Sequence, residues 1–154
     1  MNISLNVLKS EVVTSTSSVR LNLSNEPSES AMASIRSLCN NVYEPLSSAN
    51  SKSKVRILNC YINEDLCIAT GLNRSCQYAK GQAMDLDGSL GGMTTFDIFN
   101  YIKENLNFDV LVWEFGNNAS PDWVRVSYVS KEKNKGLVLR SSKNKGRVVY
   151  ETIG

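Results

Sequence analysis

The chain has 154 residues, a formal net charge of +2 and 42% hydrophobic residues. A chain of this length buries one ordinary core, so we expect a single domain spanning residues 1–154. The small charge excludes nucleic acid as an expected partner. No apolar stretch approaches a secretory signal or the roughly 20 residues of a membrane span, so we expect a protein made in the cytoplasm, with no membrane partner.

The four cysteines form no Cys-x-x-Cys pair and are too few for a disulfide scaffold. They are Cys39, Cys60, Cys67 and Cys76. We predict free thiols that are mostly buried. Zinc held by all four is the alternative, because thiolates are good zinc ligands, although the spacings do not match paired zinc knuckles.

The first third of the chain predicts an irregular arm followed by a helix. Residues 11–30 are rich in Ser, Thr, Asn and Glu, which favour turns and caps, so we expect an irregular N-terminal arm over about residues 1–27. Ser28 or a near neighbour can cap a helix whose apolar residues recur at steps of three and four. These residues are Met32, Ile35, Leu38, Cys39, Val42 and Leu46. Pro45 and the polar residues 47–53 are predicted to end this helix.

The middle of the chain is predicted to contain short strands and helices. Residues 55–61 predict a buried strand, and residues 63–71 predict a short helix closed by its final glycine. The glycine-rich residues 73–92 predict loop and strand. A second amphipathic helix is expected over residues 94–106, capped by Thr94 or Thr95.

The last third predicts strands. Residues 109–115 and 123–129 favour an antiparallel pair, because the residues between them are typical of turns. The sequence Lys-Asn-Lys-Gly occurs twice before an apolar run, which predicts a C-terminal basic β-hairpin over about residues 131–154. Together these elements predict an α+β fold, with helices packed on a small antiparallel sheet.

The C-terminal segment also concentrates positive charge. Residues 131–147 contain seven basic residues and one acid. One interpretation is a solvated hairpin whose lysines discourage pairing with other chains. The alternative is an interaction surface for an acidic protein partner. Its candidate residues are Lys133, Lys135, Lys143, Lys145 and Arg147.

Three segments, read in order, match the motifs of one known family. They are CQYAKGQAMDLD (76–87), LVWEFG (111–116) and DWVRVSY (122–128). Together they resemble the D-alanyl-D-alanine carboxypeptidase-like zinc peptidases, cell-wall hydrolases whose motifs read S-x-H-x-x-G-x-A-x-D and D/E-W-x-H. The resemblance implies the zinc D-Ala-D-Ala carboxypeptidase-like fold, of the Hedgehog/DD-peptidase type.

The first motif keeps its frame but loses its histidine. Alignment on Gly81, Ala83 and Asp85 places Asp85 at the carboxylate ligand of the family's zinc. Tyr78 then stands where the first histidine belongs, and Cys76 stands where the family has serine.

The second motif departs in the same way. Alignment on Trp123 and Val126 places Asp122 at the family's general base and Arg125 at its second histidine. The chain contains no histidine at all. Two of the three zinc ligands that the resemblance implies are therefore absent.

The replacements oppose metal binding, because a tyrosine must lose a proton of pKa about 10 to become a ligand and an arginine repels a dication. We therefore expect no metal, no other cofactor and no catalysis. We predict that Arg125 takes the place of zinc between Asp85 and Asp122, with Tyr78 donating a hydrogen bond.

The predicted function follows from the resemblance. Small members of the family without a signal peptide are frequently encoded by bacteriophages, so we expect a catalytically inactive structural or binding subunit of a phage virion, associated with its capsid, tail or fibre. Its partners would be other virion proteins. Two alternatives stay open: an active cell-wall peptidase with an altered metal site, and a module that binds peptidoglycan peptide without cutting it.

Overall fold

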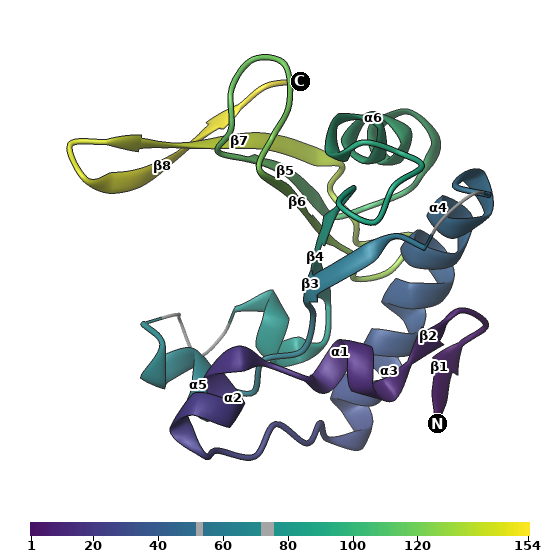
Figure 1. The fold of residues 1–154 in the computed structure, drawn as a ribbon, viewed down its shortest axis with the longest axis vertical. Coiled ribbons are helices and arrows are strands. Elements are labelled where there is room, and N and C mark those ends of the chain that lie inside the picture. Colours follow the sequence, from purple (N-terminus) through teal and green to yellow (C-terminus); the bar gives the residue numbers. More distant parts are fainter. Residues whose placement is uncertain (52–53, 72–75) are drawn as a thin grey trace.

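The computed structural model describes residues 1–51, 54–71 and 76–154, and they form an α+β fold (Figure 1). A two-stranded antiparallel sheet lies near the N-terminus, and a six-stranded sheet has the strand order β3-β4-β6-β5-β7-β8. The main sheet is mixed, because β5 and β7 are parallel whereas its other neighbours are antiparallel. The predicted α+β class is confirmed, and a small antiparallel sheet is present, but the main sheet was not predicted to be mixed.

The strands of the two-stranded sheet are β1 (Asn2–Ser4) and β2 (Val7–Leu8). The strands of the main sheet are β3 (Arg56–Asn59), β4 (Ala83–Asp87), β5 (Val110–Glu114), β6 (Trp123–Ser127), β7 (Leu137–Asn144) and β8 (Arg147–Thr152). The α-helices are α1 (Lys9–Val13), α2 (Thr16–Leu21), α3 (Glu29–Leu38), α4 (Glu44–Ala49), α5 (Glu64–Ala69) and α6 (Thr95–Asn105). Residues Cys39–Tyr43 form a π-helical turn, and Gln77–Lys80 form a 3₁₀ turn.

The N-terminal arm is ordered, so the prediction of an irregular segment was wrong. Residues 1–27 contain β1, β2, α1 and α2, and Ile3, Val7 and Val12 belong to the hydrophobic core. The polar composition does favour local turns and caps, as where Ser15 accepts a hydrogen bond from the backbone of Ser18. Burial of the three apolar side chains outweighs that local tendency and holds the arm against the body.

The helix predicted to follow Ser28 does begin there. The Ser28 side chain accepts a hydrogen bond from the backbone N–H of Ala31. Pro45 does not end the helical path, contrary to expectation. The backbone N–H of Glu44 bonds to the carbonyl of Cys39 five residues earlier, and this π-helical turn lets Pro45 stand in the first turn of α4, where its missing N–H is tolerated. Residues 52–53, at the end of the predicted stop, lie outside the described residues.

Gly71 follows α5 as predicted, with a φ of +84°, which suits glycine. Asn63, which was not predicted as a cap, begins this helix by accepting a hydrogen bond from the backbone N–H of Leu66. Thr94 caps α6 in a capping box with Asp97. Of the predicted loop over 73–92, residues 73–75 lie outside the described residues, and the remainder contains the 3₁₀ turn and β4.

One face of the main sheet is covered by helices, and the opposite face carries charged side chains. Alternate residues of β4, β5 and β6 pack in the core with apolar side chains of α3 and α6. These strand residues are Met84, Leu86, Leu111, Trp113, Val124 and Val126. The residues between them, which include Asp85, Arg125 and Glu114, belong to the opposite face because side chains alternate along a strand.

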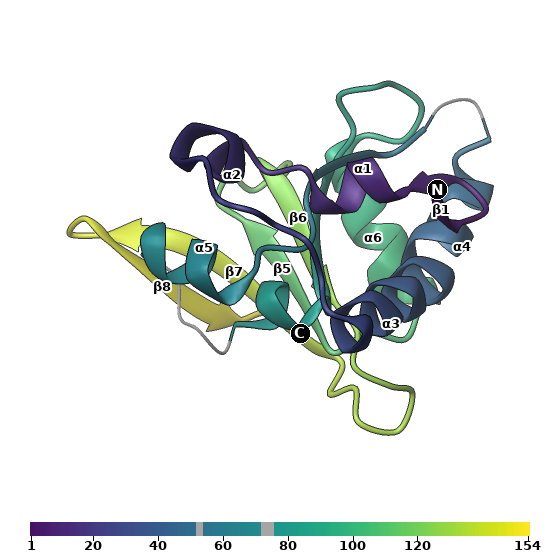
Figure 2. The same cartoon turned by 90° about the horizontal axis from the view of Figure 1, so that it is seen from below.

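The C-terminal hairpin is formed by β7 and β8 and begins at Leu137, later than the predicted residue 131. Lys145 and Gly146 make its two-residue turn, with φ values of 52° and 78°. Figures 1 and 2 show this hairpin projecting from the body. Within the described residues, no helix combines the length and the apolar character needed to cross a membrane.

Candidate functional site

The sheet brings Asp85 and Arg125 directly opposite each other. Asp85 lies on β4 and Arg125 on β6, and the antiparallel register pairs these two residues. Arg125 is also paired with Val112 of β5, so that Glu114, two residues further along β5, lies on the same face. Three charged side chains therefore come together from three adjacent strands, although their positions in the sequence are up to 40 residues apart.

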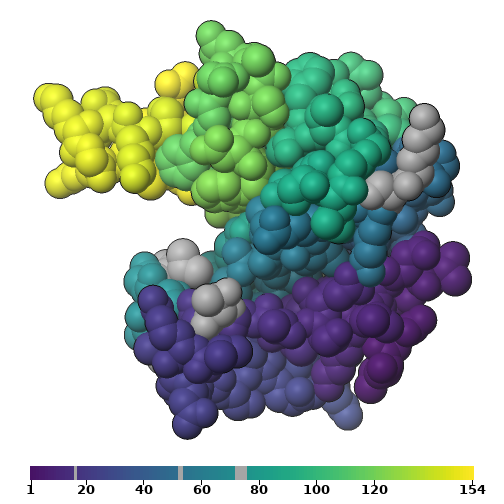
Figure 3. Space-filling view, in the orientation of Figure 1, coloured from purple at the N-terminus to yellow at the C-terminus, as the bar shows by residue number. Residues whose placement is uncertain are grey.

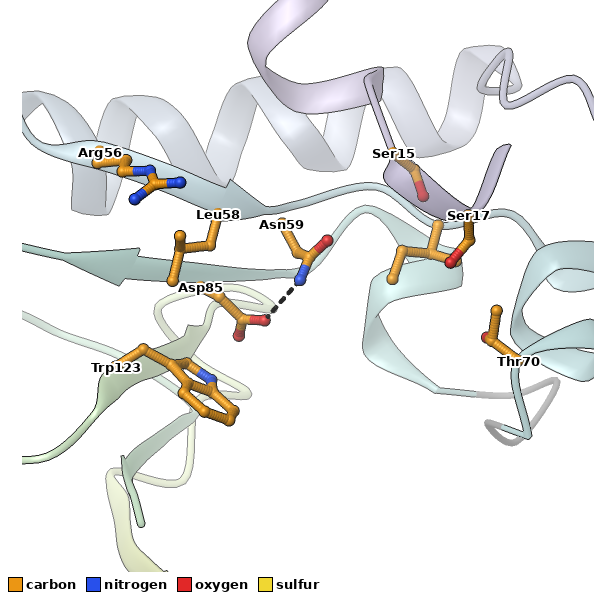
Figure 4. Close-up of a pocket in the computed structure, with 9 residues that line it drawn as sticks. Ser15, Ser17, Arg56, Leu58, Asn59, Thr70, Asp85 and Trp123 are labelled. Carbon is orange, nitrogen blue, oxygen red and sulfur yellow. Dashed lines mark hydrogen bonds between the residues drawn. The ribbon is translucent and has the colours of Figure 1, made fainter. Parts of the chain in front are cut away.

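Asp85 is buried and held by two side-chain donors. The Tyr78 hydroxyl donates to its Oδ1 at 2.6 Å, and Asn59 Nδ2 donates to its Oδ2 at 3.3 Å. Tyr78 is presented by the 3₁₀ turn that precedes β4, and Asn59 ends β3. Figure 4 shows the hydrogen bond from Asn59 to Asp85. Burial raises the pKa of Asp85 even though these donors and Arg125 act to lower it. The predicted donation from Tyr78 is thus confirmed.

Tyr78 is in its protonated form. Burial raises the pKa of its hydroxyl well above 10, the charge of Asp85 raises it further, and the charge of Arg125 acts in the opposite direction. A phenol that keeps its proton and points that proton at a carboxylate is a hydrogen-bond donor. The Tyr78 hydroxyl therefore directs its proton, and not a lone pair, toward Asp85, where a metal would need a ligand.

Arg125 has Glu114 as its carboxylate partner. Its guanidinium lies 3.8 Å from Oε1 of Glu114 and stacks 5.6 Å from the ring centre of Tyr150 on β8. Glu114 is 4% exposed, and burial raises the pKa of its carboxyl. Its Oε1 accepts no hydrogen bond from the described residues. We name Tyr78, Asp85, Arg125 and Glu114 the charged cluster.

Asp122 stands apart from the charged cluster, which corrects the prediction that it flanks Arg125. Its side chain is exposed, and it precedes the first residue of β6. Its backbone N–H donates to the carbonyl of Glu114 at 2.9 Å, so the chain turns into β6 at this residue. Strand alternation places Asp122 on the face opposite Arg125. Glu114 occupies the role that the sequence assigned to Asp122.

A sequence signal for Glu114 does exist. It is the acid in an otherwise apolar strand, two residues from Val112, and strand alternation puts both on one face. Asp122 was predicted instead because it precedes Trp123, and the family motif has an acidic residue directly before its tryptophan. The register between β5 and β6, which the sequence does not reveal, decides in favour of Glu114.

Cys76 also lies away from the charged cluster. Its Sγ is 3.1 Å from Sγ of Cys67 in α5. All four cysteines are free thiols, and Cys39, Cys60 and Cys67 are buried, as expected. Burial raises the pKa of Cys39 and of Cys67 to about 12. Among the described residues no group of three or more Cys, Asp or Glu side chains could hold a metal ion.

The family's zinc does not fit these residues. Tyr78, which the resemblance aligns with the first histidine, directs a proton toward Asp85, which the resemblance aligns with the carboxylate ligand. At the position of the second histidine, Arg125 brings a positive charge that would face a dication. The donor set lacks both imidazoles and contains a cation in their place, so these residues do not fit the zinc that the resemblance implies.

A cleft opens beside the charged cluster. One cavity of about 270 Å³ is lined by Glu114 and Arg125 together with the rings of Phe115, Trp123 and Tyr150. A second cavity of about 600 Å³ extends toward the N-terminal residues and α5. Both cavities are lined by Asn59, Ile62, Asp85 and Trp123, so they adjoin, and we refer to them together as the cleft.

The walls of the cleft come from distant parts of the chain. Val148 and Tyr150 of the C-terminal hairpin line one end, and Ser15, Ser17 and Thr70 line the other. Figure 3 shows the surface hollowed between the yellow hairpin and the lower part of the molecule that contains α2 and α5. Figure 4 shows Asp85 between Asn59 and Trp123 in this cleft.

The five basic residues of the predicted interaction surface do not form one patch. Lys133 and Lys135 precede β7, whereas Lys143, Lys145 and Arg147 surround the turn at its other end. β7 is eight residues long, which separates the two groups by about 25 Å at the rise of a strand. All five side chains are exposed.

No family model matches the chain, and no curated protein matches it. The geometry of the charged cluster and its cleft, together with the motif resemblance, is therefore the basis for a proposed function.

Proposed function

We propose that this protein is a catalytically inactive peptidase-like protein that acts as a structural or binding subunit. The observation that carries the proposal is the hydrogen bond from Tyr78 to Asp85, with Arg125 directly opposite Asp85. The motif resemblance aligns these three residues with the metal ligands of a zinc peptidase with the zinc D-Ala-D-Ala carboxypeptidase-like fold. Tyr78 donates its proton to Asp85, Arg125 lies beside Glu114, and a water-activating metal would lack both imidazole ligands there.

Binding is supported by the cleft, which the charged cluster does not fill. Ligand sites in proteins are concave, with aromatic walls and a few placed polar groups, and their volumes are about 300–1,000 Å³. The two adjoining cavities, of about 600 and 270 Å³, have these properties. We propose that the occupant is a segment of a neighbouring protein in a bacteriophage virion, as the motif resemblance implies.

A direct experiment compares cleavage with assembly. The purified protein, supplied with zinc, is incubated with peptidoglycan stem peptides, and the products are separated by mass spectrometry. We expect no cleavage, and we expect mass spectrometry of purified phage particles to detect the chain at a fixed copy number. Zinc-dependent cleavage that is lost in Asp85→Asn would overturn the proposal.

A second candidate function is binding of peptidoglycan peptide without cutting. The observation that favours it is Oε1 of Glu114, a buried acceptor that lines the cleft and accepts no hydrogen bond from the described residues. A peptide N–H or ammonium group could donate to it. Cosedimentation with peptidoglycan should then weaken in Glu114→Gln and stay unchanged in the exposed control Glu132→Gln. Equal sedimentation of both variants would contradict this candidate.

A further inference from the structure

The C-terminal hairpin leaves one edge of the main sheet open. β8 is the last strand in the sheet order, and all of its residues except Val149 are exposed. The lysines that could protect this edge are elsewhere, because Lys143 lies on β7 and Lys145 lies in the turn. β8 itself carries one cation, Arg147, and one anion, Glu151. Their opposite signs allow this edge to pair with a copy of itself.

The backbone of β8 determines which groups point outward. The pair Asn144 and Arg147 closes the two-residue turn, so it exchanges backbone hydrogen bonds. The same alternation brings the N–H of Ile153 to the carbonyl of Val138 at 3.0 Å. Arg147, Val149 and Glu151 therefore direct their backbone groups to β7. The N–H and C=O groups of Val148, Tyr150 and Thr152 face outward.

We propose that β8 pairs in antiparallel fashion with β8 of a second copy of this chain, about a two-fold axis at Val149. In this register Val148 and Tyr150 face each other across the junction, and their outward N–H and C=O groups make the new hydrogen bonds. Arg147 lies opposite Glu151 of the second copy, twice by symmetry. The two six-stranded sheets become one continuous sheet.

The charges on β8 favour this register over its neighbours. If one strand is shifted by two residues in one direction, Glu151 lies opposite the uncharged Val149 of the second copy. If it is shifted by two residues in the other direction, Glu151 lies opposite Lys145, which belongs to the turn and not to the strand. In the proposed register Glu151 instead lies between Arg140 of its own β7 and Arg147 of the second copy. Opposite charges directly across a strand pair stabilise it, whereas like charges destabilise it. The antiparallel arrangement also places the two basic turns at opposite ends of the junction.

The pairing leaves the cleft and the charged cluster in place. It uses the outer backbone edge of β8, whereas the ring of Tyr150 continues to cover Arg125 within its own chain. The inference is therefore independent of the function proposed above. Loss of dimers and loss of cleft binding are separate outcomes.

Sedimentation equilibrium of the full chain tests the pairing. We expect wild-type dimers at concentrations between micromolar and millimolar. Glu151→Arg and Arg147→Glu each place like charges opposite each other, and each should weaken dimerisation about tenfold or more. The double variant Arg147→Glu with Glu151→Arg restores opposite charges across the junction and should dimerise at least tenfold more tightly than either single variant, although Glu151→Arg also faces Arg140 of its own β7. Glu132→Arg, outside the strand, is the matched control and should dimerise normally.

A proline variant tests the backbone part of the proposal. Val148 donates its N–H outward, so Val148→Pro removes a bond of the junction without removing one to β7. It should be a monomer with an unchanged circular dichroism spectrum. A wild-type chain that stays monomeric at millimolar concentration, or a charge-swapped double variant that fails to recover dimers, would overturn the pairing.

Discussion

The two faces of the six-stranded sheet are made by alternate residues of the same strands, but different interactions stabilise them. On the face toward α3 and α6, Leu111 and Val124 are fully buried among apolar side chains. On the other face Asp85 and Glu114 are almost as deeply buried, at 5% and 4% exposed, and depend on named polar partners. The first face is held by burial of apolar area and tolerates exchange of similar shapes, whereas the second depends on each partner of its charges.

The largest expected effect is on the apolar face. Leu111→Ala removes a fully buried side chain and should lower the free energy of unfolding by about 4 kcal/mol, because the packed core collapses incompletely around the cavity. Urea unfolding followed by fluorescence measures the change. Leu5→Ala, at a residue that is 83% exposed, should change it by less than about 0.5 kcal/mol. Equal effects of the two substitutions would contradict this view of the core.

On the cleft face, Arg125→Ala should lower the free energy of unfolding by about 3 kcal/mol, because it leaves Asp85 and Glu114 without a cation. The same unfolding experiment measures it. Arg20→Ala is the matched control, since Arg20 is exposed on α2 and lies outside both the charged cluster and the proposed β8 junction. If both arginine variants unfold at the same denaturant concentration, the charged cluster does not contribute to stability.

Tyr78→Phe should have a smaller effect than Arg125→Ala. It removes the 2.6 Å hydrogen bond to Asp85 while keeping the ring, and should lower the free energy of unfolding by about 2 kcal/mol. Tyr150→Phe, which keeps the ring over Arg125, should change it by less than about 0.5 kcal/mol. A neutral Tyr78→Phe would show that Asp85 does not need this donor.

The pH dependence of stability isolates Glu114. Burial raises the pKa of Glu114 above its usual value of 4.5, so the folded state holds this proton more tightly than the unfolded state. Stability from this group is therefore present below about pH 4.5 and is lost as the pH rises through the folded-state pKa. Glu114→Gln does not titrate and should become more stable relative to wild type over that range. A difference that stays constant with pH would contradict the raised pKa.

Local signals predicted the helices well. Ser28 and Thr94 cap α3 and α6 as predicted, because a capping side chain and the first turn it satisfies are close in sequence. The antiparallel pairing of β5 with β6 was also predicted, because typical turn residues join them. The parallel pairing of β5 with β7 was not, since no local pattern records which distant strands become neighbours.

The site was predicted in part for the same reason. The motif frame indicated Tyr78, Asp85 and Arg125, and the β4–β6 register brings the last two together. Glu114 was missed because its contribution depends on the register of a third strand. The burial of Ile3 and Val7 was not predicted, because the few apolar residues in this polar segment do not recur at the spacing of a helix or a strand.

We propose that the charged cluster occupies the position that a metal ion holds in the zinc peptidases. Zinc binding tests this proposal most directly. Thermal unfolding of the wild type and of Tyr78→His with Arg125→His is measured with and without one equivalent of zinc. The wild-type midpoint should not change, whereas zinc should raise the midpoint of the variant, in which two imidazoles join Asp85. A wild-type midpoint that rises with stoichiometric zinc, and a variant that does not respond, would contradict the account.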